Sequence, residues 1–153
     1  MSVSGLPEFG TYALILRLHR ARRMQVGKLG TFNFPAGYYA YIGSAFGPGG
    51  IRARVKHHLA VPTKPHWHID YFRKACKPVE LWINDEWAKL EHSWARLMDQ
   101  LPGAERPAPR FGSSDCNCPS HLYHFTGAPS LSSFAGLVRT CRPGSGAISR
   151  FRL

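Results

Sequence analysis

The sequence predicts an α+β fold: a small, mainly antiparallel three-stranded central sheet with an added hairpin, flanked by helices. Two observations predict this class. Segments rich in apolar and β-favouring residues follow one another up to Gly43 with only short turns between them, which is the pattern of antiparallel strands. Two later segments instead repeat apolar residues every three to four positions, which is the period of an amphipathic helix.

Three strands are expected in the first part of the chain. Residues 10–18 (GTYALILRL) are apolar or β-favouring along almost their whole length. A basic turn at residues 20–23 then leads to a second short strand at residues 25–30. Residues 37–43 (GYYAYIG), rich in tyrosine and closed by glycine, form the third strand.

Helical periods follow these strands. Residues 51–59 are expected to form a helix, because an apolar residue recurs every four positions at Ile51, Val55 and Leu59. The clearest helix spans residues 85–101, with a cap at Asn84 or Asp85 and an apolar face made of Trp87, Leu90, Trp94, Leu97, Met98 and Leu101. Residues 66–72 are ambiguous between strand and helix, residues 79–83 favour a strand, and residues 121–125 can return to the sheet.

The length of 153 residues suits one compact domain. We expect this domain over residues 9–137, with a tail at residues 1–8 and a loosely held basic tail at residues 138–153, which is rich in Gly, Ser and Arg. No stretch approaches the roughly 18 consecutive apolar residues of a membrane span, and residues 1–8 lack the features of a secretion signal. We therefore expect a soluble, cytoplasmic protein with reduced cysteines, no membrane partner and no organic cofactor.

Charge is the strongest signal in the composition. Twenty Lys and Arg residues against nine Asp and Glu residues give a formal net charge of +11 and a pI near 10.0. A field of this sign attracts polyanions and accelerates their encounter with the protein. Nucleic acid is the favoured partner on these grounds, ahead of anionic membrane surfaces and small phosphorylated ligands.

The helix expected at residues 51–59 carries a candidate phosphate-binding pair. Arg54 and His58 are four residues apart, so their side chains lie on one face of the helix. The guanidinium offers a planar fork of donors and the imidazole offers a titratable donor, and both suit a phosphate. Arg52 and Lys56 form a second basic row. The alternative is an ordinary solvated basic helix.

Acidic residues are few enough to be weighed one by one, and Glu91 differs from the rest. It is expected in the middle of its helix at the edge of the apolar face, one turn from both Trp87 and Trp94. A carboxylate in that position loses hydration unless an arginine or a metal ion replaces it. The alternative is a flanking acid paired with a lysine.

Two other clusters contain metal-ligand residue types. His66, His68 and Asp70 would point the same way in an extended segment, although packing of these histidines against aromatic neighbours is the favoured interpretation. Cys116, Cys118 and His121 could supply three zinc ligands, but no fourth is evident nearby in the sequence. The favoured interpretation of this second segment is a tight, hydrogen-bonded loop whose Ser and Asp side chains face an active cleft.

Several of these features occur in a fixed order along the chain, namely Gly10-Thr11-Tyr12, Tyr41-Ile42-Gly43, Arg54, His58 and Glu91. This ordered set resembles the GIY-YIG nuclease superfamily, with Thr11 in place of the usual isoleucine of the first tripeptide. The resemblance covers residues 9–126 and looks closest to a group of the superfamily that is associated with endonuclease III. The long interval between the two tripeptides is expected to hold the extra hairpin.

The resemblance implies a GIY-YIG fold and a DNA endonuclease that hydrolyses phosphodiester bonds with one Mg²⁺ or Mn²⁺ ion. Glu91 would bind the metal, Tyr41 would act as general base on the attacking water, and Tyr12 would orient that water or Tyr41. Arg54 would stabilise the pentacovalent phosphate, and His58 would assist by hydrogen bonding or proton transfer.

Around this site, the residues expected to bind nucleic acid are Ser44, Arg52, Lys56 and Ser114. DNA is the expected partner, and the resemblance adds DNA-repair proteins. Two other interpretations stay open. One is a catalytically silent protein that recognises DNA structure, and the other is a zinc-stabilised structural protein built around the Cys-x-Cys-x-x-His cluster.

Overall fold

The computed structural model describes residues 2–153, which form seven strands and four helices. In chain order these are β1 (Gly10–Leu18), β2 (Arg22–Val26), β3 (Gly30–Phe34), β4 (Gly37–Ala45), α1 (Gly50–Leu59), α2 (His68–Arg73), β5 (Lys77–Asn84), α3 (Glu91–Asp99), β6 (Leu122–Phe125), α4 (Leu131–Cys141) and β7 (Ser149–Arg152). The α+β class is therefore confirmed.

The central sheet has five strands in the order β6-β4-β1-β5-β7, and every neighbouring pair is antiparallel. The prediction of three central strands was too low, because the short strands β6 and β7 add one strand to each edge. The hairpin is confirmed as a separate two-stranded sheet made of β2 and β3. The strand expected at residues 25–30 was misplaced, since residues 27–29 form the turn of this hairpin, with Gly27 at a φ of 50°.

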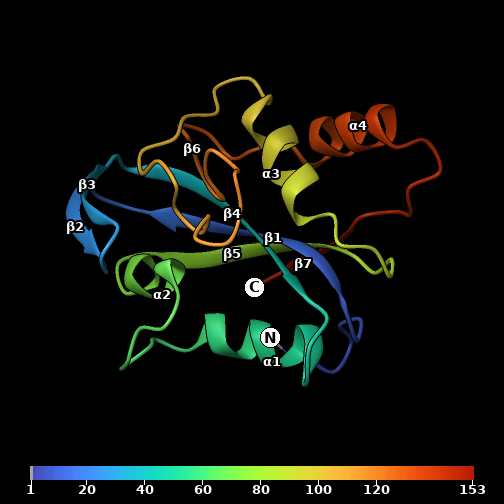
Figure 1. Ribbon diagram of the computed structural model, residues 1–153, viewed down its shortest axis with the longest axis horizontal. Helices are drawn as coiled ribbons and strands as arrows, with labels where there is room; N and C mark the ends of the chain where they lie inside the picture. The colour runs from blue at the N-terminus through green and yellow to red at the C-terminus, as the bar shows by residue number, and fades with distance from the viewer. Residues whose placement is uncertain (1) are drawn as a thin grey trace.

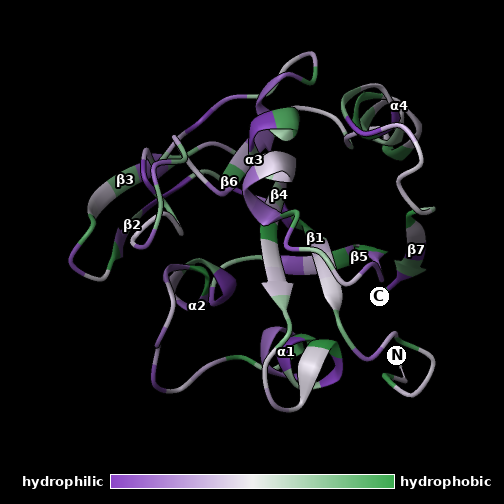
Figure 2. Ribbon diagram, turned by 45° about the vertical axis from the view of Figure 1, so that its right-hand side comes forward, coloured by the Kyte–Doolittle hydropathy of each residue, from purple (hydrophilic) through white to green (hydrophobic). Residues whose placement is uncertain are grey.

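Both faces of the central sheet are covered. Helices α1 and α2 lie on one side and α3 and α4 on the other, and the turned view in Figure 2 shows the same separation as Figure 1. Side chains alternate between these faces along β1: Tyr12, Leu14 and Leu16 enter the core on the α1 side, and Ala13 and Ile15 enter the core on the α3 side. Because β1 is central and covered twice, it is apolar along most of its length.

The helix predicted at residues 85–101 is shorter than expected. It begins at Glu91 and ends at Asp99, so Glu91 lies at the first turn and not in the middle of the helix. Trp87 was placed on the apolar face of this helix, but its side chain is exposed and packs edge-on against Phe9 and Phe46. By contrast, the predicted helix at residues 51–59 is confirmed as α1, and the ambiguous segment at 66–72 contributes to α2.

The expected loose tail at residues 138–153 is also corrected. Its first residues complete α4, and β7 pairs with β5 at the edge of the sheet, where Phe151 lies opposite Leu81 and packs on the core. At the other end of the chain, Leu6 is buried and the carbonyl of Glu8 accepts a hydrogen bond from the amide of Ile51. The basic composition of the C-terminal segment concealed an edge strand with one inward apolar side chain.

None of the helices formed by residues 2–153 combines the length and apolar character that crossing a membrane requires.

Candidate active site

Tyr12 and His58 form a buried pair on the α1 side of the sheet. The Tyr12 hydroxyl lies 2.7 Å from Nε2 of His58, and both side chains are almost fully buried. Burial, assisted by the charges of Arg54 and His57, lowers the pKa of His58 to about 3, and burial raises the pKa of Tyr12 above its ordinary value. At neutral pH the pair is therefore an uncharged imidazole and an uncharged phenol that share a hydrogen bond.

The glycine of the second tripeptide makes room for this pair. A Cβ atom added to Gly43 would lie 2.5 Å from the hydroxyl of Tyr12, on the neighbouring strand. The Tyr12 ring is fully buried and cannot retreat easily. Packing between β4 and β1 therefore explains why a residue without a side chain follows Tyr41-Ile42.

Gly43→Ala should destabilise the protein by about 1–3 kcal/mol, since the new methyl group overpacks a filled core and displaces the Tyr12 hydroxyl from His58. Urea denaturation measures the free energy of unfolding directly. Gly127→Ala is the matched control, because a Cβ at Gly127 meets no atom within 4 Å. Equal stabilities for the two variants would contradict this account of Gly43.

Tyr41 lies next to this pair, with its ring centroid 5.9 Å from that of His58. Burial raises the pKa of Tyr41 well above its ordinary value, the neighbouring Tyr12 and Glu91 raise it further, and Arg54 lowers it. A phenol acts as a general base near neutral pH only if its surroundings lower its pKa, and the net effect of the surroundings of Tyr41 is the opposite.

Arg54 is partly exposed and stacks on an aromatic ring. Its guanidinium carbon lies 4.4 Å from the centroid of the Trp67 ring, which holds the planar group in place by a cation–π contact. Both side chains line a pocket of about 270 Å³, together with Ala45, Gly47, Pro48, Gly50, Ala53 and His57.

His57 is the histidine that shares this pocket, and it was not among the residues predicted from the sequence. Its Nε2 atom lies 2.8 Å from a carboxylate oxygen of Asp70, which is buried and also accepts hydrogen bonds from the amides of His66 and Trp67. Burial acts to raise the pKa of Asp70, but these hydrogen bonds outweigh it and hold the pKa below its ordinary value. The accessible basic pair on α1 is therefore Arg54 with His57, whereas His58 faces the core.

The possible metal cluster at His66, His68 and Asp70 does not form. Asp70 accepts hydrogen bonds at the start of α2, His66 is exposed, and Nδ1 of His68 accepts a hydrogen bond from the amide of Gly112. Because the segment turns into a helix, the three side chains diverge.

Glu91 lies beside the C-terminal end of β4, where it contacts Ser44. One carboxylate oxygen accepts a hydrogen bond of 3.0 Å from the Ser44 hydroxyl, and the other lies 3.3 Å from Nδ1 of His121. Burial acts to raise the pKa of Glu91, but the interactions with His121 and Ser44 outweigh it and lower the pKa below its ordinary value. Glu91 is therefore an ionised and partly exposed carboxylate at neutral pH.

Thr11, in β1, contacts the residue that precedes α3. Thr11 is fully buried, and its hydroxyl accepts a hydrogen bond of 3.2 Å from the amide of Leu90, immediately before α3. An isoleucine has no hydroxyl and would leave this amide without that partner. Thr11 therefore helps to set the position at which α3, and with it Glu91, begins.

The charges of Arg54 and Glu91 act on both tyrosines, since Arg54 lowers and Glu91 raises the pKa of Tyr12 and of Tyr41. The five residues expected to be catalytic gather in one region. His58 is hydrogen-bonded to Tyr12 and its ring centroid lies 5.9 Å from that of Tyr41. Arg54 lies one turn earlier on α1, and Ser44 on β4 binds Glu91.

The residues expected to bind nucleic acid have different surroundings. The Ser44 hydroxyl donates a hydrogen bond to Glu91. Arg52 donates hydrogen bonds to the carbonyls of Ser4 and Leu6, and so fastens the N-terminal segment to α1. Lys56 and Ser114 are exposed, on α1 and on the loop before β6, respectively.

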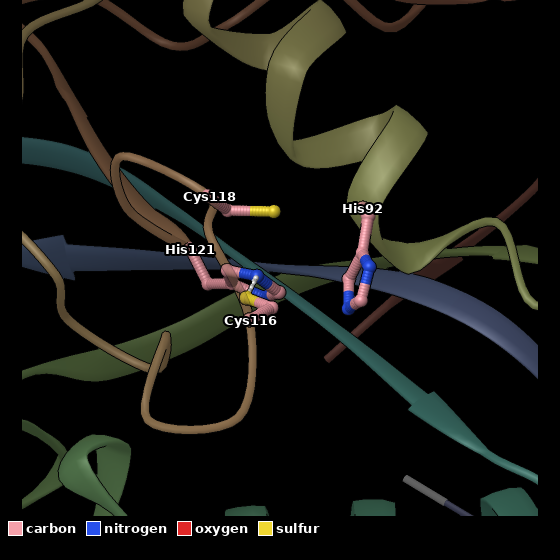
Figure 3. Close-up of side chains that lie close together, drawn as sticks. All are labelled: His92, Cys116, Cys118 and His121. Atoms are coloured by element: carbon pink, nitrogen blue, oxygen red, sulfur yellow. Dashed lines mark hydrogen bonds between the residues drawn. The ribbon is translucent and has the colours of Figure 1, made fainter.

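A second group of side chains lies next to Glu91, which His121 contacts and His92 follows in the chain. The side chains of His92, Cys116, Cys118 and His121 come together so that one ligand atom from each lies within 4.8 Å of the others, as Figure 3 shows. Cys116, Cys118 and His121 were predicted as candidate zinc ligands from the sequence, without an evident fourth ligand nearby. His92 was missed because it lies far away in the sequence, on the first turn of α3.

The fold and the site define an α+β protein in which tyrosine, histidine, arginine and glutamate side chains gather beside one end of an antiparallel sheet. Residues 11–141 match the family described as "Domain of unknown function DUF123", and the chain belongs to this family. No curated protein and no solved structure matches the chain.

Proposed function

We propose that this protein is a metal-dependent DNA endonuclease of the GIY-YIG type, which hydrolyses phosphodiester bonds. The observation that carries the proposal is the gathering of Tyr12, Tyr41, Arg54, His58 and Glu91, which come from four different elements, β1, β4, α1 and α3. The formal net charge of +11 favours a polyanionic substrate. The cytoplasm, and DNA-repair proteins as partners, remain expectations from the sequence.

The chemistry of Glu91 fits a hard divalent cation. Its carboxylate is ionised, its side chain is 28% exposed, and the hydrogen bond from Ser44 together with the contact to His121 leaves lone pairs free on its oxygens. Mg²⁺ is commonly held by one or two carboxylates together with water and substrate phosphate. When bound to Glu91, Mg²⁺ or Mn²⁺ would supply positive charge that neutralises the phosphate during hydrolysis.

Arg54 is the proposed phosphate ligand of this chain. The guanidinium presents several N–H donors in one plane, and its stacking on Trp67 limits the orientations that it adopts. His57 lines the same pocket and is anchored by Asp70, to which its Nε2–H donates; in the protonated form of the ring, Nδ1–H is a further donor. Together these groups can stabilise the negative charge that develops on the phosphate in the transition state.

The buried tyrosines position and activate the attacking water in this proposal. His58 is neutral and fixes the Tyr12 phenol through its hydrogen bond, so Tyr12 acts as an orienting group. Tyr41 remains the proposed general base. Its pKa is raised in part by the charge of Glu91, so neutralising that carboxylate brings the pKa closer to the working range.

The decisive experiment is a cleavage panel with the purified full-length protein. Duplex, single-stranded, branched and damaged DNA, and RNA, would be incubated with Mg²⁺, with Mn²⁺ or with neither. We expect nicked or shortened DNA with Mg²⁺ or with Mn²⁺, and intact DNA when neither metal is added. Intact substrates throughout the panel would overturn the proposal. Omission of the metal is the appropriate control, because a strong chelator would also remove a tightly bound ion elsewhere.

Cleavage should accelerate as the pH rises through the neutral range. Tyr41 must lose its proton to act as a base, and its raised pKa means that the deprotonated fraction grows about tenfold per pH unit below that pKa. Single-turnover rates between about pH 6.5 and 9 would measure this slope. Tyr41→Phe should be slower and should lose the slope. A wild-type rate that is already constant near neutrality would exclude Tyr41 as the base.

A second candidate function is a catalytically silent protein that binds DNA structure. The observation that favours it is the burial of Tyr12 and Tyr41, which raises both pKa values and disfavours proton abstraction. Binding to DNA would weaken steeply with salt under either function, so binding alone does not separate them. The cleavage panel does separate them.

A further inference from the structure

Two thiols and two imidazoles from distant segments point toward a common centre. His92 extends from α3, while Cys116, Cys118 and His121 belong to the loop before β6 (Figure 3). Sγ of Cys116 lies 3.4 Å from Nε2 of His121. Cys118 and His121 are buried and His92 is exposed, so the group lies at the boundary between core and solvent.

These spacings are close to those of a tetrahedral zinc centre. Zn–S bonds of about 2.3 Å and Zn–N bonds of about 2.0–2.1 Å place neighbouring ligand atoms about 3.3–3.8 Å apart. The contact between Cys116 and His121 already falls in this range, and no two of the four ligand atoms lie more than 4.8 Å apart. His92 is exposed at the start of α3, so its side chain has room to turn toward the ion.

The donor set selects the type of metal. Thiolate and imidazole ligands suit zinc, whereas Mg²⁺ and Mn²⁺ prefer carboxylate, carbonyl and water oxygens. Two cysteines and two histidines also fill all four positions of a tetrahedral ion, which is the pattern of structural zinc sites. This chemistry differs from that of the neighbouring Glu91.

We propose that His92, Cys116, Cys118 and His121 bind one Zn²⁺ ion in a closed structural site. Binding releases the two thiol protons and joins the loop that precedes β6 to the first turn of α3. Within residues 106–121 the chain forms turns and isolated contacts and no helix or strand, so a metal crosslink would supply a fixed point for it.

The zinc site would also position Glu91. If Nε2 of His121 binds the ion, the ring carries its proton on Nδ1, which lies 3.3 Å from a carboxylate oxygen of Glu91 and 3.2 Å from the carbonyl of Ile42. The proton is thus directed toward the Glu91 side chain and the end of β4. His121 would act as a positioning residue between the two centres. The zinc inference itself does not depend on nuclease activity.

Metal analysis of the purified full-length chain tests the proposal directly. We expect about one zinc ion per chain, and in Co²⁺-substituted protein the visible absorption of a tetrahedral ion with thiolate ligands. His92→Ala removes one ligand from an exposed position, so the variant should fold and should bind zinc at least about tenfold more weakly in competition with a chromophoric chelator. Cys116→Ser removes one of the two thiolates, so the thiolate-to-cobalt absorption of its Co²⁺ form should be weaker.

The controls separate this site from other metal binding. Cys141→Ser and His66→Ala replace exposed residues of the same types outside the group and should retain zinc and the cobalt spectrum. Glu91→Gln leaves all four ligands in place and should still purify with about one zinc ion and show the cobalt spectrum, even where it abolishes DNA cleavage; a lower zinc affinity in this variant is expected from its contact with His121. A chain that purifies without zinc and binds added zinc no better than His92→Ala would overturn the proposal. So would a bound zinc ion that neither His92→Ala nor Cys116→Ser weakens.

Discussion

Glu91→Gln should lower the rate of metal-dependent DNA cleavage by roughly a hundredfold or more, on the scale observed when a preorganised electrostatic group is lost. Glutamine keeps the shape of the side chain and can still accept the hydrogen bond from Ser44, so the fold should be preserved. The substitution removes the negative charge that attracts a divalent cation. Single-turnover cleavage at several Mn²⁺ concentrations would measure both the maximal rate and the metal dependence.

Glu105→Gln is the matched control for this substitution. Glu105 carries a carboxylate that is 74% exposed, and it pairs at 4.0 Å with His124, on the edge strand β6. Its replacement changes the net charge of the protein by the same amount and should leave cleavage unchanged. Wild-type cleavage by Glu91→Gln would remove Glu91 from the metal site. Full DNA binding by this variant without metal would show that the lost step follows binding.

Local patterns in the sequence predicted the strands and helix that carry most of the site. Residues 10–18 and 37–43 became β1 and β4, and residues 51–59 became α1. The two strands are almost continuously apolar because they are buried on both faces, and the helix repeats an apolar residue every four positions because it is buried on one face. Such patterns can be recognised from residues close together in the sequence. The positions of Tyr12 and Tyr41 on the α1 side follow from the same alternation.

Interactions between distant segments decided the features that were missed. The apolar period predicted a helix from residue 85, but the Thr11 hydroxyl binds the amide of Leu90 and Trp87 packs on Phe46, and both contacts draw residues 85–90 out of the helix. Strand β7 pairs with a strand more than sixty residues earlier, which its basic composition does not reveal.

The roles of adjacent histidines depended on a similar detail. Arg54 and His58 are four residues apart and share a helical face in projection, which predicted a common phosphate ligand. The hydroxyl of Tyr12 instead binds His58 in the core, and the buried Asp70 holds His57 beside the pocket. A helical period indicates which residues are neighbours, but the partners from other segments determine which of them is accessible.

Arg54→Ala should also reduce cleavage by roughly a hundredfold or more, since the substitution removes the positive charge proposed to stabilise the transition state. DNA binding should weaken much less, because many other basic residues contribute to the field of a chain with a net charge of +11. Arg54→Lys should restore little of the rate. Lysine keeps the charge but lacks the planar group that stacks on Trp67.

Arg139→Ala distinguishes a specific role of Arg54 from a general loss of charge. Arg139 is exposed on α4, which lies on the opposite side of the sheet from α1 (Figure 1). Both variants lower the net charge equally, so a contribution from the overall field should affect them alike. Slow cleavage by Arg54→Ala together with normal cleavage by Arg139→Ala would therefore identify the Trp67-stacked guanidinium as the group that acts on the phosphate. Equal losses in the two variants would assign the effect of Arg54 to DNA attraction alone.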